Sequence, residues 1–424
     1  MAIALLCALF FNQAVSLRGV FFHYDHALQN YPYRLLFARA LREGRFPLWT
    51  NQVFCGFPIF AESQSNALYP PFLALFRFLP TWVAYNYYHV LHFAMAGVFT
   101  YFLARVLGIG RAGGALAGIC YMLSGPMLYH AHHTNIIVGM AWFPLLLALM
   151  ELAFQRASPG PLLLFAGATA ALALGAQPQY TLYCALACGL YLAWRLHVLA
   201  LSGASRRRVG GFLLAFCVAG ALGGIIAAAQ ALPLAEIVGF SSRGAYALPG
   251  FSSGVPGNLM TLLLPHYFGS PGLGSYWGNF APGLYSEVTL FMGAAVLMPA
   301  IVAVLTDRKR RTLFLAGFAV FSFIFSLGFS GALYNIFGQM PVFRSSRFAT
   351  RFAFVTALCV ALLGGIGLEK LRKAADEPRV RRAALAAGAV ALTITIVFLA
   401  ITAVFQGPYV RMNFRELAAA VPLG

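Results

Sequence analysis

Acidic side chains are scarce in this chain. Its 424 residues include 11 Asp and Glu against 29 Lys and Arg, and charged residues make up 9% of the composition. Aspartate occurs three times, at Asp25, Asp307 and Asp376. So little charge excludes an ordinary soluble domain, which is about 25% charged. Any acid–base or metal chemistry therefore has few carboxylates to use.

Familiar catalytic motifs and a disulfide pattern are also missing. The sequence has no Walker, Rossmann or HExxH pattern, which removes those nucleotide-binding and zinc-protease classes. Six of the seven cysteines lie within apolar runs and Cys55 alone sits in a polar loop, so a disulfide framework is not expected. Internal repeats and matched broken halves are not visible either, which disfavours a secondary transporter.

Long apolar runs are what the chain does contain. Hydrophobic residues make up 61% of it and the mean hydropathy is +0.78, which is typical of an all-α, multi-pass membrane protein. About eleven spans are expected from these runs. They cover roughly residues 2–17, 83–103, 112–128, 136–152, 161–175, 180–194, 211–232, 288–305, 312–328, 352–368 and 383–404.

Basic residues predict the orientation of these spans. The net charge of +18 is scattered in short clusters between apolar runs, which indicates membrane topology and not nucleic-acid binding. A cytoplasmic N-terminus puts 17 of the 29 basic residues on short inner connections. They are Arg105, Arg111, Arg156, Arg195, Arg206, Arg207, Arg208, Arg308, Lys309, Arg310, Arg311, Lys370, Arg372, Lys373, Arg379, Arg381 and Arg382.

This orientation leaves three long segments outside the cytoplasm, at residues 23–81, 236–287 and 330–351, together with a shorter turn at 130–135. The inner connections hold little besides charge, so we expect the chemistry on the outer side of a single domain, 1–424. Asp307 and Asp376 fall on the inner side. Asp25 is therefore the leading candidate for an acid–base or metal-linked carboxylate, with Glu62 and Glu287 as further candidates.

Arginines supply the candidate cationic groups. Residues 32–45 predict a helix in the headgroup plane with Tyr33, Leu36 and Phe37 on its apolar side and Arg34 on its polar side. Arg34 would then meet a lipid phosphate, unless the helix is a plain anchor. Arg344, Arg347 and Arg351 are spaced to converge on a phosphate at the head of a span, and the alternative is that they snorkel at the membrane surface.

Other polar residues of the outer segments predict the rim of a pocket. The histidine-rich turn at 130–135 is tempting as a zinc site, but no Cys, Asp or Glu completes a shell within that turn. Hydrogen bonding to sugar or phosphate is the preferred interpretation, and the aromatic-rich segment 241–285 is compatible with a sugar site. The rim candidates are His26, Gln29, Gln64, His130, His132, His133, Asn135, Gln177 and Gln179.

Several ordered motifs carry a resemblance to a known family. They include Asp25, Gln29, Tyr31-Pro32, Pro47-Leu48-Trp49 and Gly56-Phe57-Pro58, and later Gln177-Pro178-Gln179, Pro265-His266-Tyr267 and Phe343-Arg344. Together they cover nearly the whole chain. In these residues the chain resembles the YfhO-type membrane proteins of the GT-C superfamily of polyprenyl-phosphate-sugar-dependent glycosyltransferases.

The resemblance implies a GT-C bundle with long extracytoplasmic loops, juxtamembrane helices and a catalytic pocket at the outer face. It implies that Asp25, just after the first span, serves as general base or metal-linked carboxylate, with Mg²⁺ or Mn²⁺ as the cofactor in the second case. The donor would be a polyprenyl-phosphate sugar. The acceptor would be an envelope polymer, lipid or protein at the plasma membrane.

Two other functions stay open from the residues themselves. A transporter or flippase of lipid-linked sugars would use the same charged pocket for binding alone, and a scaffold of an envelope-synthesis complex would use it for neither. Relatives in the family often continue beyond this length, so a further C-terminal region is expected outside this chain. The sugar, the acceptor, the metal and the oligomeric state have no signal in the sequence.

Overall fold

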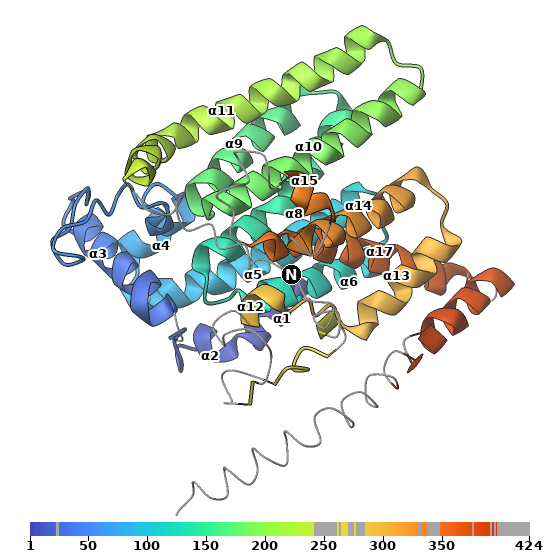
Figure 1. The fold of residues 1–424 in the computed structure, drawn as a ribbon, viewed down its shortest axis with the longest axis horizontal. Helices are drawn as coiled ribbons and strands as arrows, with labels where there is room; N and C mark the ends of the chain where they lie inside the picture. The colour runs from blue at the N-terminus through green and yellow to red at the C-terminus, as the bar shows by residue number, and fades with distance from the viewer. Residues whose placement is uncertain are drawn as a thin grey trace, which may run out of the picture.

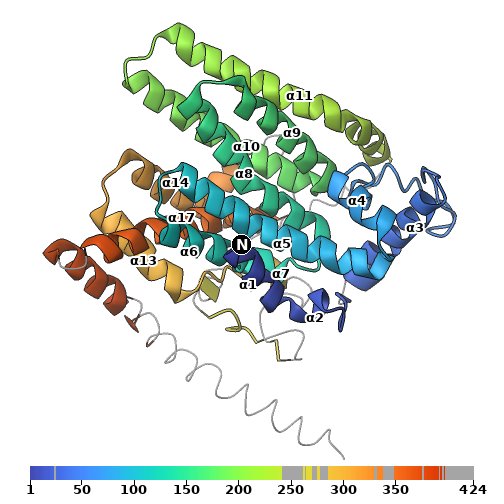
Figure 2. The same ribbon diagram turned by 180° about the vertical axis from the view of Figure 1, so that it is seen from behind.

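The computed structural model shows a bundle of helices (Figures 1 and 2). It describes residues 1–22, 25–240, 261–262, 264–269, 275–276, 285–328, 332–337, 348–374, 377–390, 392–393 and 396. Within these ranges the chain forms helices and turns, with one isolated β-bridge between Thr50 and Phe57 and no extended strand. The predicted helical membrane protein is consistent with this architecture.

In the part of the chain that the structure describes, five helical segments are long and apolar enough to cross a membrane. Four are the helices α5 (Thr81–Val106), α8 (Thr134–Arg156), α10 (Pro178–Leu201) and α11 (Arg206–Gly239). The fifth, Ala349–Ala374, joins a 3₁₀ turn (Ala349–Phe352) to α17 (Ala353–Ala374). Each coincides with a predicted span. The total of eleven spans stays a prediction.

The other apolar runs form shorter helices. The first run is divided into α1 (Ala2–Phe10) and α2 (Asn12–Val15), and the run at 112–128 into α6 (Arg111–Met122) and α7 (Gly125–Tyr129). The second break falls at Gly125, whose N–H donates to the carbonyl of Phe291 at 2.6 Å instead of to a helical partner. Further short helices are α9 (Pro159–Gly175), α12 (Tyr285–Val288), α13 (Ala294–Thr306), α14 (Arg310–Ser326) and α15 (Ala332–Phe337).

Two groups of connections lie at opposite ends of the bundle. The α10–α11 and α13–α14 connections lie at one end, and α3 (Tyr31–Arg42), α4 (Pro70–Phe78) and the last turns of α11 lie at the other (Figures 1 and 2). These are the ends that the basic residues assign to the inner and outer sides. The orientation of these two ends across a membrane stays a prediction.

Glycine allows a close helix crossing in the core. A Cβ added to Gly365 of α17 would lie 2.5 Å from the carbonyl oxygen of Gly113 in α6, and one added to Gly113 would lie 2.2 Å from the carbonyl oxygen of Gly365. Small residues let membrane helices approach until their backbones touch. This contact fixes α17, and with it the turn that carries Arg351, against the centre of the bundle.

The first outer segment has a core of its own. Tyr33 and Phe37 of α3 pack with Phe72 and Phe76 of α4 and with Tyr88 of α5. The predicted helix at 32–45 is present as α3, but it is folded into the protein. The segment therefore forms a cap over the first turns of α5, and this cap positions the site.

Candidate functional site

A buried ion pair forms the innermost part of the site. Arg351 donates from Nε to Glu287 Oε2 at 2.9 Å and from Nη2 to Glu287 Oε1 at 2.5 Å. Their side chains are 7% and 4% exposed. The residues come from the turn before α17 and from α12, so this two-point contact joins segments 64 positions apart. A bidentate guanidinium–carboxylate pair is among the stronger polar contacts in proteins.

Two glutamines complete the shell of Arg351. Its Nη1 donates to Gln177 Oε1 at 2.8 Å and to Gln179 Oε1 at 3.2 Å. The amide of Gln179 donates in turn to the carbonyl of Phe348 at 2.9 Å. Gln177 and Gln179 lie at the N-terminal end of α10, where Pro178 begins the helix. The predicted rim glutamines and the predicted arginine are therefore in direct contact.

Two histidines extend this shell toward the surface. His130 Nε2 lies 3.8 Å from Glu287 Oε2, and His130 Nδ1 lies 3.1 Å from His133 Nδ1. One of these two Nδ1 atoms must carry a proton and the other must accept it. His133 Nε2 lies 3.4 Å from Asp25 Oδ2. A chain of polar groups thus runs from Asp25 through both imidazoles to Glu287 and Arg351.

Burial governs the protonation of this pair. Desolvation lowers the pKa of His130 well below its ordinary value, and the charge of Arg351 and the presence of His132 lower it further. Desolvation likewise lowers the pKa of His133, followed by the effects of His130 and His132, while Glu287 acts in the opposite direction. Both imidazoles are therefore neutral near pH 7, so they lie between the two carboxylates as uncharged groups and not as cations.

Asp25 is the solvent-accessible end of this chain of polar groups. Its side chain is 44% exposed, against 4% for Glu287. Asp25 precedes a π-helical turn, His26–Asn30, that leads into α3. Burial of the next residue holds this turn in place, because His26 Nδ1 contacts the hydroxyl of Tyr85 at 2.6 Å. Asp25 is thus a solvent-reachable carboxylate on a fixed support.

Arg34 lies elsewhere than the helical wheel predicts. It is 0% exposed, and its Nη2 donates to Asn66 Oδ1 at 2.6 Å and to Asn135 Oδ1 at 3.0 Å. Its guanidinium also faces the Tyr88 ring at 5.5 Å. The prediction that Arg34 lies on an exposed polar face is wrong, because these amide oxygens and the aromatic ring replace its hydration. That position does not favour a contact with a lipid phosphate.

Asn30 and Asn66 are members of the site that sequence reasoning missed. Asn30 Nδ2 donates to the carbonyl of His132 at 3.1 Å, which ties the turn after Asp25 to the histidine turn. Asn66 Nδ2 donates to the carbonyl of Gly175 at 2.6 Å. Asn66 also has a left-handed backbone with φ of 58°. Neither asparagine sits in a recognisable motif, so only the fold reveals them.

The remaining predicted residues divide between two places. Asn135 and His132 lie next to the chain of polar groups, since Asn135 contacts Arg34 and His132 contacts His133. Gln29 lies half-buried in the turn after Asp25. Glu62 and Gln64 instead contact each other, at 3.1 Å between Gln64 Nε2 and Glu62 Oε1, beside a separate groove. Arg344, Arg347 and most of the aromatic-rich segment 241–285 lie outside the described residues.

A metal site is not evident in this arrangement. Within the part of the chain that the structure describes, no group of three or more His, Cys, Asp or Glu side chains is placed to hold one ion. The two histidines and two carboxylates follow one another in a line, whereas a metal requires its ligands around a common centre. A role for Asp25 in binding Mg²⁺ or Mn²⁺ stays a prediction.

Comparison with models of protein families finds none that matches the chain, and comparison with curated proteins likewise finds no match.

Proposed function

We propose that this chain is a membrane glycosyltransferase that moves a sugar from a polyprenyl-phosphate carrier to an envelope acceptor outside the cytoplasm. The resemblance in sequence suggests this reaction. The observation that carries the proposal is the position of Asp25, an accessible carboxylate at the head of a buried polar chain. Such a carboxylate is suited to accept a proton from a hydroxyl group.

In the proposed reaction Asp25 takes the proton of the acceptor hydroxyl. The acceptor oxygen then forms a bond to the anomeric carbon while the bond from that carbon to the phosphate oxygen breaks. The lipid phosphate leaves with its negative charge, which requires cationic groups nearby. Arg344 and Arg347 are the proposed partners of the phosphate, because Glu287, Gln177 and Gln179 already occupy most of the N–H groups of Arg351.

The histidine pair supports Asp25 in this proposal. His133 Nε2 lies 3.4 Å from Asp25 Oδ2, and the aspartate side chain is 44% exposed, which leaves room for the acceptor to reach the carboxylate. Because the imidazoles are neutral, they orient the carboxylate without neutralising it. Glu287 and Arg351 form the other, buried end of this chain of polar groups and hold it in place.

The test is transfer of labelled sugar from polyprenyl-phosphate sugar in membranes that contain the protein. Asp25→Asn should lower transfer by at least about 100-fold, the usual contribution of a positioned base. Glu43→Gln is the matched control, since Glu43 is an exposed carboxylate of the same segment whose ion pair is with Arg45. Equal transfer by Asp25→Asn and the wild type would contradict the assignment. Binding of the donor by the protein without any transfer of its sugar would favour a transporter.

A further inference from the structure

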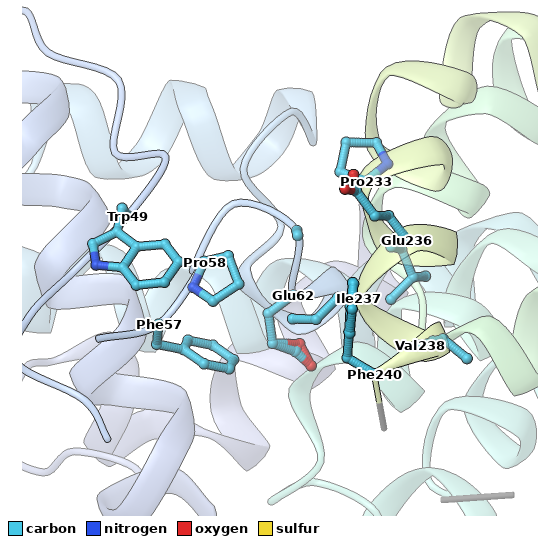
Figure 3. A pocket seen from close by; sticks show the side chains of 11 residues that line it. Trp49, Phe57, Pro58, Glu62, Pro233, Glu236, Ile237, Val238 and Phe240 are labelled. Atoms are coloured by element: carbon cyan, nitrogen blue, oxygen red, sulfur yellow. The ribbon is translucent and has the colours of Figure 1, made fainter. Parts of the chain in front are cut away.

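A second candidate site, mostly apolar with two carboxylates, lies beside the chain of polar groups that starts at Asp25. It is a groove of about 720 Å³ between the first outer segment and the last turns of α11 (Figure 3). Trp49, Phe57 and Pro58 form one wall, and Ile237 and Phe240 belong to the other. The two walls are tied together because Gln230 of α11 donates to the carbonyl of Phe60 at 2.6 Å. This volume suits a small organic ligand.

The indole of Trp49 is held as an accessible flat surface. Its Nε1 donates to Asn51 Oδ1 at 3.0 Å. The next residue, Thr50, forms a β-bridge with Phe57 that closes the loop. Gly56 makes room for the ring, because a Cβ there would lie 2.9 Å from Trp49 Cζ2 and its φ is +144°. Trp49 is nevertheless 59% exposed. A fixed, exposed aromatic ring offers a stacking surface with little loss of conformational entropy on binding.

Two carboxylates complete the groove. Glu62 is fixed by the N–H of Gln64 at 3.1 Å and reaches into the groove from the loop side, and Glu236 belongs to α11 (Figure 3). The lining of the groove in the described part of the chain includes no Lys, Arg or His, although the chain has 29 Lys and Arg. A phosphate or other anion would be repelled there. Hydroxyl and ammonium groups would find acceptors.

The groove adjoins the site described above. Glu62 is followed by Ser63, whose carbonyl accepts from Asn135 Nδ2 at 3.4 Å. The carbonyl of Asn135 in turn accepts from the N–H of Gln177 at 3.2 Å. A ligand in the groove is thus separated from the Arg351 shell by a short run of packed polar residues.

We propose that this groove binds a saccharide whose bound unit is neutral or amino-substituted, stacked on Trp49 and hydrogen-bonded to Glu62 and Glu236. An aromatic ring beside carboxylates matches the apolar faces and hydroxyl edges of a sugar. The described lining of the groove has no basic residue, so the groove does not suit the anionic donor and favours a different ligand. If the proposed function holds, this saccharide is the acceptor; the binding itself does not depend on that function.

The test is equilibrium binding to the full chain in nanodiscs, with three probes of similar size. These are oligomers of N-acetylglucosamine, of glucosamine and of galacturonic acid, which are neutral, cationic and anionic. We expect the cationic oligomer to bind most tightly, because Glu62 and Glu236 line the groove, the neutral one to bind more weakly, and the anionic one not to bind. Trp49→Ala should weaken it about tenfold, close to the value of one stacked aromatic contact, and the double variant Glu62→Gln/Glu236→Gln should abolish the preference for the cationic over the neutral oligomer.

Two controls separate a binding effect from misfolding. Trp82→Ala removes another exposed tryptophan, 43% accessible on α5, and should leave binding unchanged. Trp49→Phe keeps an aromatic ring and should retain most of the affinity. Failure of all three oligomers to bind, preference for the anionic one, or binding insensitive to Trp49→Ala would overturn the proposal. Binding of a saccharide without any sugar transfer would support this binding site and contradict the proposed glycosyltransferase activity.

Discussion

At the residue scale, the pair Glu287–Arg351 dominates the energetics of the site. Removing one partner leaves the other charge buried without compensation, which typically costs on the order of 3–5 kcal/mol. We therefore expect Glu287→Gln and Arg351→Gln each to lower the thermal unfolding temperature in detergent strongly. The double variant should lose less than the sum of the two, because neither charge then remains. Additive losses would show that the two side chains do not act as a pair.

The histidines predict a pH dependence of stability. Burial lowers the pKa of His130 and His133 in the folded protein, whereas the unfolded chain titrates near ~6.5. Below ~6.5 the unfolded state binds more protons, so stability is full above that pH and falls as the pH decreases, by about 1.4 kcal/mol per pH unit for each such histidine. The facing groups that bear on this are Asp25, His132, Glu287 and Arg351.

The measurement is the unfolding temperature between pH 5 and 8, with the slope as the readout. His130→Gln should reduce the slope below ~6.5 even though the variant is less stable overall. An unchanged slope in His130→Gln would show that folding does not lower the pKa of this imidazole.

At the element scale, the α6–α17 crossing predicts opposite effects of one substitution at two glycines. Gly365→Ala places a methyl group 2.5 Å from the Gly113 carbonyl oxygen, so it should destabilise the protein by about 1–3 kcal/mol. Gly167 of α9 has open space around its Cβ position. Gly167→Ala should therefore stabilise by up to about 1 kcal/mol, because alanine favours the helix.

Thermal unfolding of both alanine variants in the same detergent checks this prediction. The same direction of change at Gly365 and Gly167 would contradict it. Gly365 also bears on function, since α17 follows the turn that holds Arg351. Sugar transfer should therefore fall in Gly365→Ala and stay normal in Gly167→Ala.

How far the elements could be predicted depended on their length. The runs that became α5, α8, α10, α11 and α17 were recognisable because each is long, apolar and bounded by charge or proline. The run at 112–128 looked equally continuous, but Gly125 bonds to Phe291 from a distant segment and the helix divides there. Such a break depends on a tertiary contact, which local pattern does not contain.

At the scale of the whole molecule, topology predicted which residues could meet but not how they pair. Asp25, Glu287 and Arg351 belong to three outer segments, and the orientation of the spans placed all three on one side. Their order along a chain through His130 and His133 came only from the structure. Arg34 shows the limit most clearly, because its burial depends on Asn66 and Asn135, distant in sequence and supplied by other elements.

The identity of the donor is central to the proposed function. The direct measurement is sugar transfer by the purified chain in proteoliposomes, with the labelled sugar presented either on polyprenyl phosphate or on a nucleoside diphosphate. We expect transfer from the lipid-linked sugar alone, to an acceptor on the face that carries α3 and Asp25. Transfer from the nucleotide sugar, or translocation of the lipid-linked sugar without bond formation, would contradict the proposed function.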